Sequence, residues 1–226
     1  MNNNFLLNLI LLLIPFALYF DHRGHIFRNW KAMVPGVIIT GIAAIVIKLA
    51  FTHYGLVIYE ESHGSGLLFY EIPLESALFS FTVPFAGLGI YAYLNGRYPG
   101  NELEKYSLAF SNILLGLSIA ILFFAYTKIY AVLTFSILLL FLFCIEYVNK
   151  LRFMYRFYRA YLAFTVLYAV SQLFFNGYNT VLYNIATTLK FKVIASPFEN
   201  YFLLMLLLLV AVYLFEYFKR KNHGIA

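Results

Sequence analysis

The sequence predicts an all-α integral membrane protein with seven transmembrane helices, built from two parallel three-helix repeats and a linker helix. Three observations support this fold class: an apolar composition, seven apolar runs, and a match between the two halves of the chain. Of the 226 residues, 63% are hydrophobic and 12% are charged. A soluble domain usually carries about 25% charged residues, so the composition indicates a protein that lies in a bilayer.

The seven apolar runs give the expected helices, since a spanning helix needs roughly 20 mostly apolar residues. The runs cover residues 5–20, 32–51, 73–94, 106–124, 130–148, 158–175 and 197–218. The first run is expected to be a retained helix, because no basic segment precedes it and no small-residue cleavage site follows it. We therefore expect the first repeat at 1–95, the linker helix at 96–127, and the second repeat with a basic tail at 128–226.

The basic residues predict the orientation of these helices. Twelve of them lie in one set of alternate loops: Arg23, Arg28, Lys31, Arg97, Lys105, Lys150, Arg152, Arg156, Arg159, Lys219, Arg220 and Lys221. The opposite set of loops holds Lys128, Lys190 and Lys192. The positive-inside rule then places the N-terminus outside and the C-terminus in the cytoplasm, in the inner membrane of a cell. The net charge of +6 is read as a topology signal and not as a nucleic-acid site.

The two halves of the chain match without gaps at an offset of 124 residues. Pro-x-Glu occurs at 73–75 and again at 197–199, and Lys48 falls on Gln172. A single linker helix between two three-helix repeats makes the repeats parallel. Both Pro-x-Glu motifs are therefore expected to begin helices on the outer side of the membrane. The two glutamates can therefore converge on one composite site.

Pro-x-Glu has a structural and a functional interpretation. Proline at the first helical position, with a carboxylate in the first turn, is a favourable helix start in any protein. The functional interpretation is a partly buried carboxyl that gives or takes a proton at neutral pH. Nearby aromatic residues could stabilise a cation, although aromatic residues also gather at membrane interfaces: they are Tyr54, Tyr59, Tyr70, Phe79, Tyr178, Tyr183 and Tyr201.

Four segments resemble the lycopene cyclase domain family, which includes heterodimeric bacterial cyclases and the cyclase half of bifunctional fungal enzymes. They read AMVPGVIITGIAAIVIKLAFTHYGLVIYEES and IPLESALF in the first half, and FFNGYNTVLYN and SPFENYFLLMLLLLVAVYLFEYF in the second. The resemblance implies a cofactor-independent, redox-neutral isomerase acting on a carotenoid end group. The family motif has a second acid after each glutamate, where this chain has Ser76 and Asn200. Relatives often carry Trp-Asp where this chain has Ile47-Lys48, and tryptophans expected after Gly55 are absent.

The candidate site follows from the repeat and the resemblance together. Glu75 and Glu199 are expected to act as acid and base, because one carboxyl and one carboxylate suffice to start and end a cyclisation. Lys48 and Gln172 are expected beside them. Lys48 either pairs with a glutamate, giving it the base role, or extends to the interface. The expected lining is Tyr54, Tyr59, Asn176, Tyr178 and Tyr183.

No cofactor and no metal is expected, and the expected partners are the lipid bilayer and a hydrophobic isoprenoid or carotenoid. A second copy of the chain, or another carotenoid-pathway enzyme, stays open as a partner. Asp21 is the only aspartate, which argues against a prenyltransferase that holds magnesium diphosphate through paired aspartates. Five scattered histidines are too few for a di-iron site, and no Gly-x-Gly-x-x-Gly motif follows a strand.

Two other functions stay open at this point. Small-solute transporters can also be built from parallel repeats of three helices with one linker helix. Their helices are interrupted by prolines in both halves, whereas the runs at 130–148 and 158–175 contain none. The second alternative is a catalytically degenerate relative that binds an isoprenoid or another membrane protein. The replacement of both second acids, at Ser76 and Asn200, is what such a relative would show.

Overall fold

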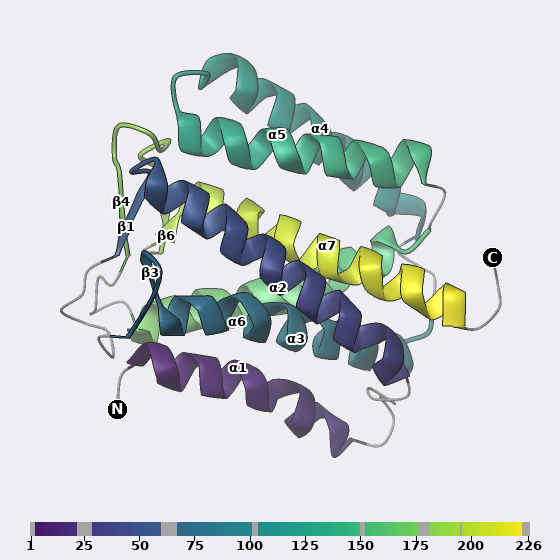
Figure 1. Cartoon of the computed structure of the whole chain (residues 1–226). Helices are drawn as coiled ribbons and strands as arrows, with labels where there is room; N and C mark the ends of the chain where they lie inside the picture. The colour runs from purple at the N-terminus through teal and green to yellow at the C-terminus, as the bar shows by residue number, and fades with distance from the viewer. Residues whose placement is uncertain are drawn as a thin grey trace.

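The computed structural model describes residues 3–21, 29–59, 67–100, 104–149, 152–175, 181–194 and 196–222. Within these residues the chain is mostly helical, with six short strands and the turns that connect these elements (Figure 1). The helices are α1 (Asn3–Tyr19), α2 (Trp30–His53), α3 (Leu74–Arg97), α4 (Glu104–Phe124), α5 (Ile129–Phe143), the π-helix η3 (Cys144–Val148), α6 (Met154–Phe175) and α7 (Phe198–Asn222).

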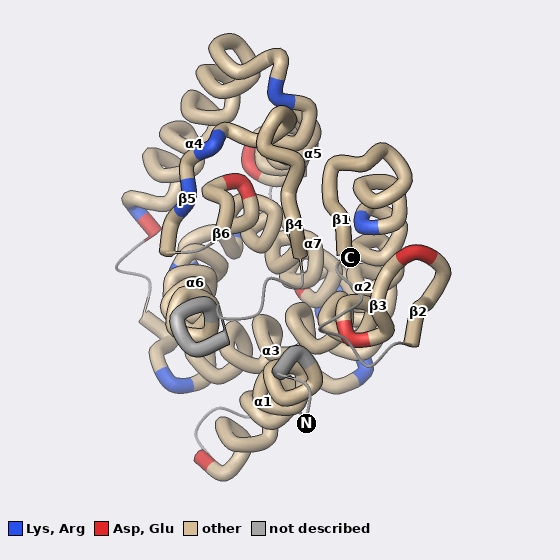
Figure 2. The backbone as a smooth tube through the Cα atoms, turned by 90° about the vertical axis from the view of Figure 1, so that its left-hand side faces the viewer, with Lys and Arg blue, Asp and Glu red and all other residues tan. Residues whose placement is uncertain are grey.

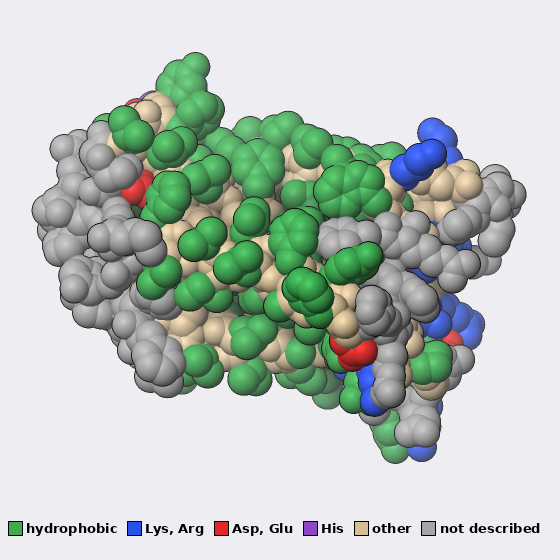
Figure 3. All heavy atoms as spheres, turned by 90° about the horizontal axis from the view of Figure 1, so that it is seen from below, with side chains coloured by type: hydrophobic (Ala, Val, Ile, Leu, Met, Phe, Trp, Pro, Cys, Tyr) green, Lys and Arg blue, Asp and Glu red, His purple; other side chains and the backbone are tan. Residues whose placement is uncertain are grey.

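The described helices include five that are long and apolar enough to cross a membrane. These are α2, α3, α4, α5 with its continuation η3, and α7, while Phe5–Tyr19 forms a shorter apolar helix. Hydrophobic side chains cover the middle of the face seen in Figure 3, and the Lys and Arg side chains in that view gather at one end. An apolar surface of this extent is typical of contact with lipid. The chain therefore has the helices and the surface of a membrane protein.

The helices α3 and α7 form the centre of the molecule. They pack against each other; α3 also contacts α1, α2 and α6, and α7 also contacts α2, α5 and α6. The helix α4 lies outside, against α5 and α6. A Cβ atom on Gly87 of α3 would lie 2.2 Å from a methyl carbon of Leu208 on α7. Small residues of this kind allow helices to approach closely in membrane proteins.

The strands lie at the end of the molecule where α3 and α7 begin, which is the end that Figure 2 faces. Strand β1 (Val57–Tyr59) pairs in antiparallel register with β4 (Val181–Tyr183), and Ile58 lies opposite Leu182. Because Ile58 and Leu182 are themselves 124 residues apart, the equivalent residues of the two halves meet at the centre of this ladder. The paired strands therefore join the two halves of the chain directly.

Two further hairpins recur at the same offset. Strands β2 (Leu68–Phe69) and β3 (Ile72–Pro73) pair with Leu68 opposite Pro73, and β5 (Lys192–Val193) and β6 (Ser196–Pro197) pair with Lys192 opposite Pro197. Their turns contain Tyr70 at φ 57° and Ile194 at φ 59°, again 124 residues apart. Bulky residues rarely adopt this left-handed conformation, so its occurrence at both positions is a specific local similarity.

The structure differs from the expected elements in two respects. The segments directly before α3 and α7 contain short strands, whereas the sequence predicted an all-α chain. In addition, Pro73 is the N-cap residue of α3, with extended backbone at φ −60° and ψ 143°, and the first helical residue is Leu74. Proline occupies this position because β3 and α3 meet there, and its fixed φ suits both.

Candidate active site

The two glutamates of the Pro-x-Glu motifs occupy equivalent places in the fold. Glu75 lies in the first turn of α3 and Glu199 in the first turn of α7. Their side chains are 2% and 0% exposed. Both helices begin beside the strand pairs at one end of the molecule (Figure 1). A carboxylate in a first turn is favoured by the helix dipole, but burial of both side chains exceeds what a helix start requires.

The two carboxyl oxygens of Glu199 have different surroundings. Oε1 accepts a hydrogen bond from the backbone N–H of Leu189 at 2.6 Å. Oε2 is buried and accepts no hydrogen bond from the residues that the structure describes. Buried polar atoms are nearly always hydrogen-bonded, so an exception is a candidate for a catalytic or ligand-binding role.

Asn200, which follows Glu199, is the centre of a buried polar network in the second half. Its Oδ1 accepts a hydrogen bond from the hydroxyl of Tyr130 at 2.6 Å. Its Nδ2 donates to the hydroxyl of Tyr183 at 2.7 Å and to Oγ of Ser196 at 2.8 Å. The Ser196 hydroxyl is in turn 3.2 Å from the hydroxyl of Tyr168. Asn200 therefore bonds directly to three hydroxyl groups and reaches a fourth through Ser196.

Ser76, which follows Glu75, has a smaller network in the first half. The ammonium group of Lys48 donates to the carbonyl oxygen of Ser76 at 2.7 Å and to its Oγ at 3.2 Å. Oγ of Ser76 donates to the hydroxyl of Tyr59 at 3.2 Å. Lys48 also lies 5.3 Å from the ring centre of Phe79, within cation–π distance. The ammonium group of Lys48 is thus held at the first turn that carries Glu75.

The same contact recurs in both halves. Ser76, after Glu75, bonds to Tyr59 of β1, and Asn200, after Glu199, bonds to Tyr183 of β4. The ring centres of Tyr130 and Phe51 lie 5.1 Å apart, and those of Tyr130 and Tyr183 lie 5.8 Å apart. Burial raises the pKa of the Tyr183 hydroxyl, and the neighbouring Tyr168 and Tyr59 raise it further. Burial likewise raises the pKa of Tyr59. Both hydroxyls are therefore neutral near pH 7, able to donate and accept hydrogen bonds.

The other expected lining residues have varied positions. Tyr54 is 74% exposed and lines a surface hollow of about 430 Å³, together with Leu49, Ala50, His53, Tyr70 and Glu71. Gln172 lies on α6, whereas Asn176 and Tyr178 fall outside the described residues. Among the described residues, no group of three His, Cys, Asp or Glu side chains could hold a metal ion.

Three residues of the network were missed in the sequence: Tyr130, Tyr168 and Ser196. At the offset of 124 residues they fall on Leu6, Ala44 and Ile72, so comparison of the two halves gives no signal for them. Tyr130 begins an apolar run, where an interfacial aromatic residue is the ordinary interpretation. Only the packing of α5 against α7 makes it a partner of Asn200.

The fold and the site together define a helical membrane protein with two buried carboxyls in equivalent helix starts, beside tyrosine hydroxyls. The family model for lycopene cyclase matches residues 4–94 and 127–218, which is most of the chain. The chain therefore belongs to the lycopene cyclase family, and the resemblance noted in the sequence is confirmed. No curated protein and no solved structure matches it. The family implies a hydrophobic isoprenoid substrate in a membrane environment.

Proposed function

We propose that the chain cyclises an end group of a linear carotenoid such as lycopene, with Glu75 and Glu199 supplying acid and base. The observation that carries the proposal is the burial of both glutamates, at 2% and 0% exposure, in the first turns of α3 and α7. Membership of the lycopene cyclase family supports the reaction class. A buried carboxyl can give or take a proton in a site that excludes water, which suits a hydrocarbon substrate whose reactive groups are its double bonds.

The reaction needs only a proton donor, a proton acceptor and a dry cavity. A carboxyl proton adds to the terminal double bond of the linear end group, which leaves a tertiary carbocation. The electron pair of an internal double bond attacks this cation, closes the six-membered ring and moves the positive charge into the ring. A carboxylate then removes a ring proton and a new double bond forms. No electrons are gained or lost, and exclusion of water prevents capture of the cation.

Aromatic rings beside the carboxyls suit the charge of the intermediate. The rings of Phe51 and Tyr183 both contact the ring of Tyr130. The hydroxyls of Tyr130 and Tyr183 are hydrogen-bonded to Asn200. The face of an aromatic ring attracts a cation, with an effect of about 2 kcal/mol or more when water is absent. These rings, with Tyr59, are therefore the proposed lining of the end-group site.

The proposal includes a membrane arrangement of seven spanning helices in two repeats, at 1–95 and 128–226, joined by a linker at 96–127. The recurrence of the hairpins and of the left-handed turn residues at an offset of 124 supports it. The bias of basic residues toward one set of loops supports a cytoplasmic C-terminus. Under this arrangement the end-group site lies near the outer interface, where the end of a spanning polyene also lies.

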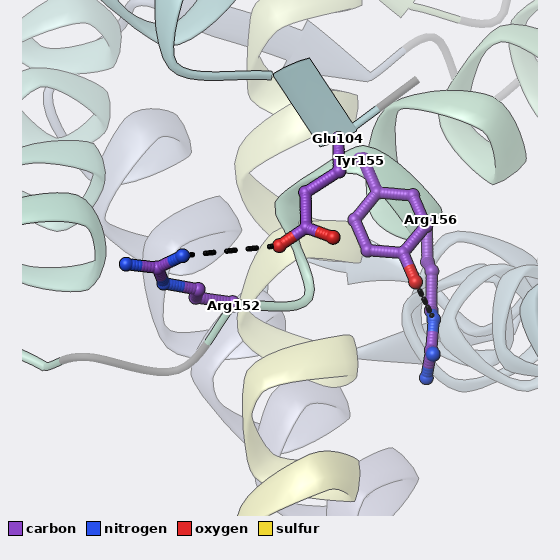
Figure 4. A network of polar contacts seen from close by, with 4 residues as sticks. All are labelled: Glu104, Arg152, Tyr155 and Arg156. Carbon is purple, nitrogen blue, oxygen red and sulfur yellow. Dashed lines mark hydrogen bonds and ion pairs between the residues drawn. The ribbon is translucent and has the colours of Figure 1, made fainter. Parts of the chain in front are cut away.

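The test is a pigment profile in a bacterial host that accumulates lycopene. The wild-type chain is compared with a Glu75→Gln, Glu199→Gln double variant, and pigments are separated by chromatography. Glu104→Gln is a matched control, because Glu104 pairs with Arg152 at 4.0 Å in an exposed surface contact (Figure 4). We expect monocyclic or bicyclic products from the wild type and the control, and none from the double variant. Unchanged lycopene beside well-expressed, membrane-inserted wild type would refute cyclase activity toward lycopene.

One observation favours a second candidate, a relative that binds an isoprenoid without converting it. Ser76 and Asn200 stand where the family has second acids, and both are engaged in internal hydrogen bonds. A binding protein needs the apolar surface and the aromatic lining but no proton donor. Lycopene that co-purifies unchanged with the wild-type chain, and equally with the double variant, would favour this candidate.

A further inference from the structure

The helix α7 carries an apolar stripe on a side that lies between α5 and α2. Phe202 and Tyr213 mark the side toward α5, since their rings contact rings of that helix. Ala211 marks the side toward α2, because its carbonyl oxygen would lie 3.4 Å from a Cβ atom on Gly36. Between these two sides, four half-buried residues follow one another at helical spacing and form what we call the α7 stripe: Leu203, Leu207, Val210 and Leu214. In Figure 1, α7 is visible between α5 and α2.

The equivalent face of α3 is buried. At the offset of 124 residues, the α7 stripe falls on Phe79, Val83, Ala86 and Ile90. Val83 and Ala86 are 0% exposed and Ile90 is 5% exposed. The helices α1 and α6, which both pack against α3, also contact each other. Their counterparts α5 and α2 meet at the end where α7 begins, through the rings of Tyr130 and Phe51. The open face therefore belongs to one half and is not a general result of the repeat.

The α7 stripe leads to Glu199. Glu199 precedes Leu203 by four residues, so the two side chains lie on the same face of α7, one turn apart. Leu203 also packs against the cluster of Phe51 and Tyr130, two rings of the proposed lining. From Leu203 to Leu214 the stripe is about 16 Å long, at about 1.5 Å per residue. It therefore connects the apolar surface of the molecule with the turn that carries a proposed catalytic carboxyl.

We propose that the polyene chain of the substrate lies along the α7 stripe, between α2 and α5, so that its end group reaches Glu199. The inference rests on the proposed function and adds where the rest of the substrate binds. The side chains of the stripe have no hydrogen-bonding group, which suits a hydrocarbon chain.

The stiffness of a polyene favours it over a lipid acyl chain as the occupant. Lipid is as apolar as the stripe, so packing and conformational freedom decide what binds there. A conjugated polyene is straight before it binds and loses little freedom along a straight stripe, whereas a flexible acyl chain loses more. A second copy of the chain is a poorer fit, because the stripe is half-buried between two helices and another helix is about 10 Å wide.

Bulky substitutions on the stripe test the proposal. Leu207→Trp and Val210→Trp place a large ring in the stripe, two or three turns away from Glu199. Ile113→Trp is the matched control, because Ile113 is 65% exposed near the middle of α4, which packs against α5 and α6. Each protein is purified from a host that accumulates lycopene. The lycopene bound per mole of protein and the cyclic products are then measured by chromatography, and folding is checked by thermal unfolding.

The wild type and Ile113→Trp are expected to retain lycopene and to form cyclic product. Both stripe variants should bind about tenfold less lycopene or lower, and should form correspondingly less product. Glu199→Gln should behave in the opposite way, with bound lycopene near the wild-type amount and no cyclic product, because it removes a reacting group and leaves the polyene site intact. If a tryptophan variant fails to fold, Leu207→Ala and Val210→Ala remove contacts without adding bulk and should show a partial loss of bound lycopene.

The outcomes separate the polyene site from the function on which it rests. Folded stripe variants that keep the wild-type amount of lycopene would overturn the inference while an active wild type sustained the cyclase. In that case, loss of a wild-type dimer on gel filtration would assign the stripe to a second copy, and an unchanged mass would assign it to lipid. A wild type that binds lycopene without forming cyclic product would refute the cyclase, and the stripe variants would still decide the polyene site through bound lycopene. A wild type that binds no lycopene would overturn both.

Discussion

Removing the hydroxyl of Tyr130 should destabilise the protein, because it leaves a buried acceptor without a donor. The Tyr130 hydroxyl donates to Oδ1 of Asn200 at 2.6 Å, and the two residues are 1% and 8% exposed. Phenylalanine keeps the ring contacts with Phe51 and Tyr183, so the change isolates the hydrogen bond. An unsatisfied buried acceptor costs about 1–3 kcal/mol. For a chain of this size that corresponds to a fall of about 2–12 °C in melting temperature.

The assay is thermal unfolding of the purified protein in detergent. Tyr147→Phe is a matched control, since the Tyr147 hydroxyl also donates to an asparagine Oδ1, that of Asn112, at 2.6 Å, but in an exposed contact. We expect the control to change stability by no more than about 0.5 kcal/mol. A double-mutant cycle with Asn200→Ala should give a coupling energy of about 0.5–3 kcal/mol. Equal effects of Tyr130→Phe and Tyr147→Phe, or a coupling energy of zero, would refute the reasoning.

Three further predictions concern packing, activity and pH. In Gly89→Ala the new Cβ would lie 2.7 Å and 2.8 Å from ring carbons of Pro15, so we expect the free energy of unfolding to fall by about 1–3 kcal/mol in the same thermal assay. Gly116→Ala is the control and should cause no such loss, because its Cβ meets open space. Lys48→Met should lower the rate of cyclisation about tenfold or more, which corresponds to about 1.4 kcal/mol in the activation barrier. Lys48→Arg should recover part of this rate. Unchanged product yield and unchanged stability in Lys48→Met would show that Lys48 has no role in the reaction. Because burial raises the pKa of Tyr183, the folded state holds that proton more tightly, so its stabilising effect is complete below about pH 10 and is lost as pH rises beyond it. Melting temperatures between pH 8 and 11 should therefore fall less steeply in Tyr183→Phe, and an identical slope would contradict this.

The helices were predictable from the sequence because an apolar run of sufficient length has few other stable states in a bilayer. The run at 130–148 became α5 with η3, Ile129–Val148, which agrees to within one residue. The run expected at 158–175 begins earlier, at Met154, and its first turns include the buried Tyr155 and the polar Arg156. Hydropathy alone excludes such a turn, although packing against the rest of the molecule stabilises it.

The strands were not predictable in the same way. Each has only two or three residues, which is too short for the alternation of apolar and polar residues that identifies a strand. Similarly, the partners of Asn200 come from α5, β4 and β6, three elements that only the packed structure brings together. The positions of Glu75 and Glu199 were predictable because both follow a proline at the same point of an internal match, and no tertiary contact is needed to see it.

The departures from symmetry are more informative about mechanism than the symmetry itself. Two carboxyls in identical surroundings would be equally good acids and equally good bases, yet a cyclisation moves its proton from one group to the other in one direction. The chain keeps both glutamates but differs at the neighbouring positions, with Lys48 against Gln172 and Ser76 against Asn200. Lys48 brings an amino group to the first turn of α3 in one half, and Asn200 brings a network of hydroxyls to the first turn of α7 in the other. A variant that exchanges these neighbours while keeping both glutamates should therefore alter turnover more than it alters the fold, since the exchange changes the electrostatics of each carboxyl but leaves α3 and α7 in place.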